Sequence, residues 1–145
     1  MENYSKPLPQ PTSTSAPFWE AAHRGHLALQ YCSACDNFQY YPRVICANCW
    51  NEDIQWRRCS GRARVYSYSV CHVAGLPAFK HVVPYVVSVV ELEEGVRMTT
   101  NIVDCDPAEV YIGMAVEAVF RRVTDDCTLV EFRPAVANTL MNQGR

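Results

Sequence analysis

The chain has 145 residues, enough for one ordinary domain or two small ones, and 49% of them are apolar, so a hydrophobic core is available. Its formal net charge of −2 argues against a protein whose main task is to bind nucleic acid. No run of about 18 apolar residues predicts a membrane span. Residues 1–4 are acidic and no apolar stretch follows them, unlike a secretory signal peptide, so we expect a cytoplasmic protein with reduced cysteines.

The first part of the chain predicts an arm followed by a short helix. Residues 1–16 are rich in proline, serine and threonine, a composition that favours an extended, flexible arm. Residues 17–28 form the expected helical unit, in which Pro17 suits the first turn and Gly25 ends the helix. Phe18 and Trp19 are expected on its apolar side.

Two closely spaced cysteine pairs follow in the pattern C-x2-C-x10-C-x2-C, formed by Cys32, Cys35, Cys46 and Cys49. A separation of two residues lets one turn direct both sulfurs at one point, and two such turns make a tetrahedral four-thiolate site suited to zinc. We therefore predict a rubredoxin-like zinc ribbon over residues 29–58. Four sulfur ligands leave no open coordination position, so the expected single zinc ion is structural. Trp50, Ile54 and Trp56 follow the second pair and are expected to cover the ribbon.

Three other uses of the same cysteines compete with zinc. Two disulfides would require an oxidising compartment, and an iron centre of the rubredoxin type would also use four thiolates. A single C-x2-C pair would permit redox chemistry, whereas two pairs at this spacing disfavour it. The four other cysteines lie in or beside apolar stretches and are predicted to be small buried hydrophobes: Cys59, Cys71, Cys105 and Cys127.

Residues 59–134 are β-rich, and residues 135–145 are expected to form a loose tail. The predicted strands cover residues 62–73, 85–92, 96–103, 114–123 and 127–133. Five strands with a connecting segment between the third and fourth favour an OB-fold barrel over a generic small sandwich. The overall expectation is a mainly β chain with a short N-terminal helix, a zinc ribbon and a five-stranded barrel. Alternation in the first strand predicts Val65, Ser67 and Ser69 on one face, and Tyr66, Tyr68 and Val70 on the other.

The order of these parts resembles a bacterial and archaeal zinc-ribbon plus OB-fold family long catalogued as a domain of unknown function. The resemblance covers residues 17–134. It rests on Phe18-Trp19-Glu20, the two cysteine pairs, Tyr41-Pro42-Arg43, Trp56, Ser60-Gly61, Pro84-Tyr85, Glu91-Leu92-x-x-Gly95 and Ile112-Gly113-Met114-x-Val116. The sequence departs from the family pattern at Asp36, where a glycine often follows the first pair, and at Tyr41, which replaces a common proline.

The resemblance implies a non-catalytic accessory subunit. Members of the family it resembles are small partners of thiolase-superfamily enzymes that act on acyl-CoA. These enzymes are of the thiolase, acyl-CoA synthase or aldolase type. The chain is then expected to join a thiolase-fold subunit in a hetero-oligomer, while the catalytic residues belong to that partner. The resemblance also implies that a CoA thioester can be bound at the interface with the partner.

Five residues are candidate contacts for CoA or for a partner protein. Arg62 and Arg64 point the same way on a strand, and paired guanidinium groups match phosphate geometry. Arg43 is a similar candidate. Phe79 and Lys80 lie in a loop that contains apolar residues, at the barrel face commonly used for ligands. The competing interpretation for the arginines is a solvated face of the barrel.

Three other functions remain open at this point. A single-stranded nucleic-acid binder would use aromatic side chains for stacking, here Phe38, Tyr40, Tyr41, Tyr66 and Tyr68. The acidic balance and the presence of only two lysines count against it. A small electron carrier would contain iron in place of zinc. Independent catalysis would need His72, His81 or Cys71 to form a constellation with a carboxylate, and no spacing links them.

Overall fold

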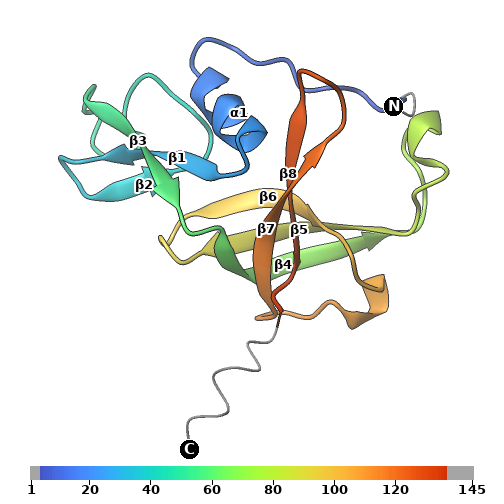
Figure 1. Cartoon of the computed structure of the whole chain (residues 1–145). Coiled ribbons are helices and arrows are strands. Elements are labelled where there is room, and N and C mark those ends of the chain that lie inside the picture. Colours follow the sequence, from blue (N-terminus) through green and yellow to red (C-terminus); the bar gives the residue numbers. More distant parts are fainter. Residues whose placement is uncertain (1–3, 137–145) are drawn as a thin grey trace, which may run out of the picture.

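A short helix precedes two small β units, which follow one another along the chain (Figure 1). The computed structural model describes residues 4–136. Helix α1, Ala16–His23, has Pro17 in its first turn and buries Phe18, Ala21 and Ala22. It ends earlier than the predicted unit 17–28, because Gly25 adopts a φ of 82° and reverses the chain. Leu27 and Ala28 belong instead to the first strand.

The first β unit is a three-stranded antiparallel sheet with the strand order β2-β1-β3. Its strands are β1 (Leu27–Cys32), β2 (Asn37–Gln39) and β3 (Ile54–Cys59). All six residues of the central strand β1 are buried, although Gln30 is polar. The sheet therefore carries the first cysteine pair at the end of a fully covered strand.

The second unit is a closed five-stranded barrel, which confirms the predicted mainly β fold. Its strands are β4 (Arg62–Cys71), β5 (Tyr85–Leu92), β6 (Arg97–Ile102), β7 (Ala115–Arg122) and β8 (Thr128–Pro134). The order around the barrel is β4-β5-β6-β8-β7, and β4 closes it by pairing with β7. Strands β6 and β8 run parallel and pair only at Ile102 and Phe132, while the other pairs are antiparallel, as in an OB fold. Single-turn 3-10 helices occupy the β4–β5 and β6–β7 connections, at Pro77–Phe79 and Pro107–Glu109.

The predicted alternation along β4 is wrong beyond Val65. A register shift between Val65 and Ser67 in the pairing with β5 marks a β-bulge at Tyr66. Val65 is buried before the bulge, whereas Tyr68 and Val70 pack against the core after it. An extra residue in one strand reverses the faces of all residues that follow, and simple alternation does not reveal it.

The two β units share one hydrophobic core. Phe18 from α1 and Leu27 and Leu29 from β1 belong to the same buried cluster as the barrel residues Val65 and Phe132. The chain passes from the ribbon to the barrel at Gly61. Its φ of 77° and its close approach to Ala118 leave little room for a side chain at this position. The ribbon is therefore packed on the barrel rather than tethered to it.

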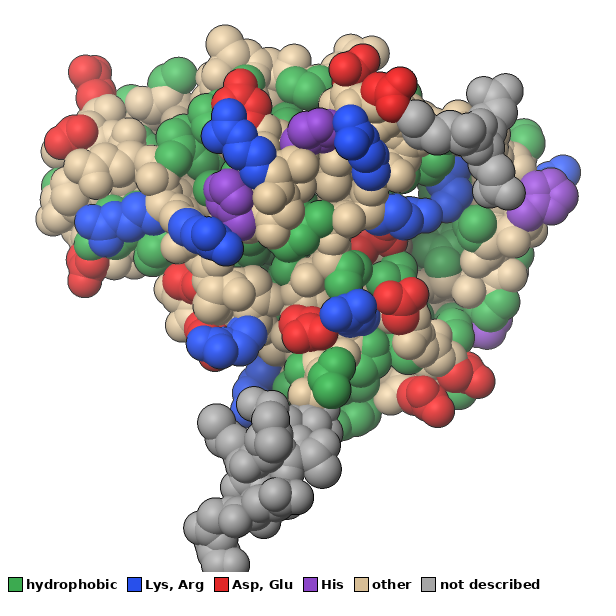
Figure 2. All heavy atoms as spheres, in the orientation of Figure 1, with side chains coloured by type: hydrophobic (Ala, Val, Ile, Leu, Met, Phe, Trp, Pro, Cys, Tyr) green, Lys and Arg blue, Asp and Glu red, His purple; other side chains and the backbone are tan. Residues whose placement is uncertain are grey.

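The surface carries mixed charge. Lysine and arginine side chains are interspersed with aspartate and glutamate on the face shown in Figure 2. Within residues 4–136, no helix is long and apolar enough to cross a membrane. Most of the predicted C-terminal tail, residues 137–145, lies outside the described residues.

Candidate metal centre and surrounding surfaces

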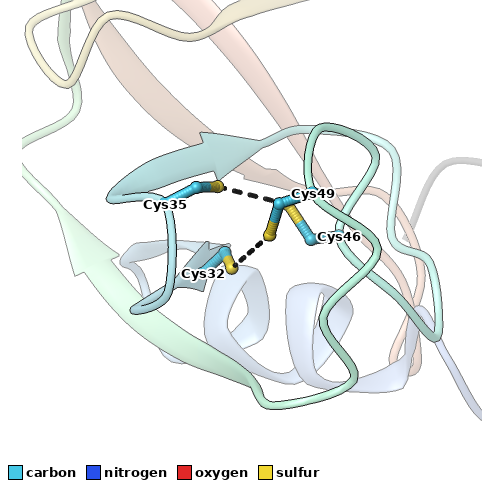
Figure 3. Close-up of side chains that lie close together, drawn as sticks. All are labelled: Cys32, Cys35, Cys46 and Cys49. Atoms are coloured by element: carbon cyan, nitrogen blue, oxygen red, sulfur yellow. Dashed lines mark hydrogen bonds between the residues drawn. The ribbon is translucent and has the colours of Figure 1, made fainter.

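The four cysteines predicted as metal ligands converge at the tip of the ribbon (Figure 3). Their Sγ atoms all lie within 4.8 Å of one another, with 3.5 Å between Cys32 and Cys49 and 3.6 Å between Cys35 and Cys46. Cys32 and Cys46 are buried, Cys35 is half-buried and Cys49 is exposed. One pair comes from the β1–β2 turn and the other from the loop before β3, so the two turns face each other.

The sulfur positions suit a tetrahedral ion and not two disulfides. Zinc–sulfur bonds of about 2.3 Å place the sulfurs of a regular tetrahedron about 3.8 Å apart, close to the observed separations. A disulfide would need about 2.05 Å, and all four thiols are free. Within residues 4–136, this is the one group of three or more potential ligand side chains close enough to hold a metal.

Both cysteine turns end in a residue with a left-handed backbone. Asp36 follows Cys35 with a φ of 57°, and Trp50 follows Cys49 with a φ of 67°. Aspartate tolerates this conformation better than most residues, so the departure from the family's glycine leaves the first turn intact. The Tyr31 hydroxyl donates a hydrogen bond to the Asp36 carboxylate and anchors this turn to β1.

Hydrogen-bond donors around the sulfurs favour thiolates at two positions. The Asn48 and Asn37 side chains lower the pKa of Cys35 to about 6. Backbone N–H groups of Cys49 and Asn48 lower the pKa of Cys46. At Cys49 the Asn51 backbone N–H lowers the pKa, but partial desolvation of the sulfur and hydrogen bonds with the other three cysteines outweigh it and raise the pKa to about 12. A bound dication would stabilise all four thiolates together.

Two glutamines that the sequence analysis missed hold the second cysteine turn against β1 and β2. Buried Gln30 donates to the Arg43 carbonyl and accepts from the Arg43 backbone N–H, both at 2.8 Å. Gln39 donates to the Gln30 side chain at 2.7 Å and accepts from the Ala47 backbone N–H at 2.9 Å. The one sequence signal was a polar residue, Gln30, between two apolar residues of a buried strand.

The structure separates the three candidate arginines. Arg43 is exposed on the ribbon. Arg62 pairs with Glu93 at 2.9 Å, and Arg64 lies beside Glu91 in the β4–β5 pairing and donates to the Gly113 carbonyl. No acid lies between Gln55 and Val90 in the sequence, but the β5–β6 hairpin brings Glu93 to Arg62, while Glu91 pairs with Arg97 at 3.0 Å. A phosphate at Arg62 would have to share the guanidinium with Glu93, which binds its Nε.

The two loop candidates differ from each other. Phe79 ends the 3-10 helix of the β4–β5 connection and is half-buried, with its ring 5.7 Å from that of Tyr85. The Lys6 ammonium lies 5.4 Å from the Phe79 ring centroid. Lys80 is exposed.

The aromatic residues proposed for base stacking do not form one platform. Phe38, Tyr40 and Tyr68 pack against the hydrophobic core. Tyr41 on the ribbon and Tyr66 on β4 are exposed, and the Arg97 guanidinium stacks on the Tyr66 ring at 3.7 Å. Trp50 is 76% exposed and does not cover the ribbon as predicted, whereas Trp56 packs against the hydrophobic core.

A four-cysteine ribbon packed on an OB barrel places the chain in the class of zinc-ribbon and OB-fold proteins. Two family models agree with this order: "ChsH2, rubredoxin-like zinc ribbon domain" matches residues 19–55, and "ChsH2, C-terminal OB-fold domain" matches residues 56–121.

Relatives then define the family. A "DUF35 domain-containing scaffold protein" of Methanocaldococcus jannaschii is 47% identical over 96 residues, which are 66% of this chain and 67% of that one. The chain belongs to the DUF35 family. It is also 38% identical over 131 residues to a "probable enoyl-CoA hydratase alpha subunit" of Thermomonospora curvata; the match covers 90% of this chain and 40% of that protein.

A solved structure covers both units. The chain matches one described as "Ltp2-ChsH2(DUF35) aldolase" with a TM-score of 0.78 and 38% identity, over 88% of this chain and 99% of that chain. The ribbon and the barrel therefore have the same arrangement in both proteins.

Proposed function

We propose that this protein is a non-catalytic, cytoplasmic subunit that binds an enzyme of the thiolase superfamily acting on acyl-CoA thioesters. The observation that carries the proposal is the match, over 99% of its length, to a DUF35 chain whose structure is described as an Ltp2-ChsH2 aldolase. The scaffold and CoA-hydratase names of two relatives support the same class of role. We assign catalysis to the partner.

The metal centre has a structural role in this proposal. Cys32, Cys35, Cys46 and Cys49 would hold one zinc ion with no open position for substrate. The ion would keep the loop from Tyr41 to Cys49 in place, together with the Gln30 and Gln39 hydrogen bonds. A rigid ribbon then presents exposed side chains such as Trp50 to a partner.

The candidate contacts differ in their surroundings. Phe79 and Lys80 are the best placed to meet a partner, because they lie on a projecting loop with the exposed apolar residues Val73, Leu76 and Val82. Arg43 is exposed next to the second cysteine turn. Arg62 binds Glu93 through its Nε and Arg64 donates to the Gly113 carbonyl, so a CoA phosphate would be bound by their remaining N–H groups.

The test is affinity purification of the tagged protein from its native host, followed by mass spectrometry and light scattering. We expect a stable hetero-oligomer with a thiolase-fold enzyme. The Phe79→Ala/Lys80→Ala double variant should bind this partner at least about tenfold more weakly, whereas Thr99→Ala, on the exposed side of β6, should bind normally. Recovery of the protein alone, or with a partner of another fold, would refute the proposal.

A further inference from the structure

A hollow of about 560 Å³ lies on the side of the barrel, between β5–β6 and β7–β8. Its walls are mainly apolar and include Phe79, Tyr85, Ile102 and Phe120. In Figure 2 a recess opens on the right side of the molecule, with green side chains in its depth and blue ones at its edge. The volume is within the range of small-molecule sites.

The hollow coincides with the face of an OB fold that is most often used for ligands. That face is formed by the second and third barrel strands and the loop between the first and second. Here these are β5, β6 and the β4–β5 loop, which contributes Phe79 and Val82. Sparse pairing between β6 and β8, limited to Ile102 and Phe132, leaves room at this point of the barrel.

The N-terminal arm lies along the edge of the hollow. Lys6 is one of its lining residues and places its ammonium over the Phe79 ring. Tyr4 and Lys6 are both half-buried, and Lys6 lines the same hollow as Arg121 and Phe79, so the arm lies against the barrel here. Pro7, Pro9 and Pro11 favour an extended backbone in this segment. The arm therefore crosses the edge of the hollow at Lys6.

Cations outnumber acids among the lining residues, with Lys6, Arg121 and Arg133 against Asp104 and Glu131. Arg121 uses its Nε to bind the buried Glu131 at 2.5 Å, and Arg133 uses its Nε to bind Glu117 at 2.9 Å. Both arginines keep terminal N–H groups for further bonds and are about half exposed. Lys6 has no carboxylate partner within residues 4–136.

We propose that this hollow binds a small amphipathic organic anion, an apolar ring system or acyl chain that carries one carboxylate or sulfonate, and that the N-terminal arm closes over it. The apolar part packs against Phe79, Ile102 and Phe120. The anionic group lies at the edge, within reach of Lys6 and Arg121. The site shares Phe79 with the proposed partner surface, but its lining comes from this chain alone, so binding is tested without a partner.

The test uses the isolated full-length protein and two fluorescent probes of similar shape. 1-Anilinonaphthalene-8-sulfonate is anionic, and N-phenyl-1-naphthylamine is its neutral counterpart. We expect saturable one-to-one binding of the anion, tighter than that of the neutral probe. Phe79→Ala should weaken both probes about tenfold. Lys6→Met should weaken the anion about fivefold and the neutral probe less than twofold.

Arg58→Met is the control, because Arg58 is an exposed cation that does not line the hollow. Near-ultraviolet circular dichroism confirms that each variant is folded. Absence of saturable binding, or equal binding by Phe79→Ala, would overturn the site. Equal affinity for both probes, or an equal loss in Lys6→Met and Arg58→Met, would overturn the anionic specificity and the role of the arm.

Discussion

Loss of the metal should destabilise the barrel as well as the ribbon. Helix α1 and strand β1 cover the barrel core through Phe18, Leu27 and Leu29, which are 7%, 2% and 0% exposed. Strand β1 ends at Cys32, so its position depends on the metal centre. Removal of zinc with a strong chelator, or the Cys46→Ser substitution, tests this dependence.

The size of the effect follows from the buried side chains. Full burial of each large apolar side chain contributes about 1.5–3 kcal/mol, so uncovering these three costs about 5–9 kcal/mol. The whole unfolding free energy of a domain is about 5–15 kcal/mol. A loss of this size corresponds to a fall in melting temperature of more than about 15 °C. We therefore expect the apo protein to be largely unfolded near its former working temperature.

The assay is thermal unfolding monitored by near-ultraviolet circular dichroism, with the metal content measured in parallel. The holo protein should contain one zinc ion per chain and unfold in a single transition. Cys127→Ser, a half-buried cysteine outside the metal centre, is the control and should retain both. An apo protein or Cys46→Ser variant that melts within about 3 °C of the holo protein would refute the reasoning.

Three further predictions concern single sites. Arg121→Met leaves the carboxylate of Glu131 buried without its partner and should cost about 1–3 kcal/mol in urea unfolding, since Arg121 is half exposed; an unchanged midpoint would contradict this. Burial raises the pKa of Cys59 to about 12, so at pH 8 it is almost entirely a thiol and should resist iodoacetamide in the native protein; alkylation at the rate of the unfolded chain would disprove it. Because Asp36 has a left-handed backbone, the Asp36→Gly variant should retain zinc better than the Asp36→Ala variant by about 1 kcal/mol. Tyr31→Phe removes the hydrogen bond to Asp36, so it should weaken zinc retention only in a protein that still has Asp36. Metal competition with a chromophoric chelator measures the zinc affinity of each variant.

The metal centre and the barrel strands could be predicted from residues close together in the sequence. The two-residue separation within each cysteine pair indicates where four sulfurs can meet, because each turn is only four residues long. Strand boundaries also followed from alternation and turn residues, with β5 found at Tyr85–Leu92 as expected. The bulge at Tyr66 escaped this reasoning because no residue type requires it there.

The electrostatic surroundings of the candidate residues could not be predicted in the same way. Arg62 meets Glu93 across 31 positions of sequence, and Gln30 meets the backbone of Arg43 through a loop. Such contacts depend on strand register and barrel closure, which short windows of sequence do not carry.

The sequence by itself determined the order of the parts, the four-thiolate constellation and the family resemblance, because these depend on residue types at short, covalently set separations. Only the tertiary structure decided which arginines have acidic partners, where Trp50 points, and that an arm without core residues lies beside a hollow in the barrel. These features arise where segments distant in sequence come together, and there the folded geometry sets which charges and apolar faces meet.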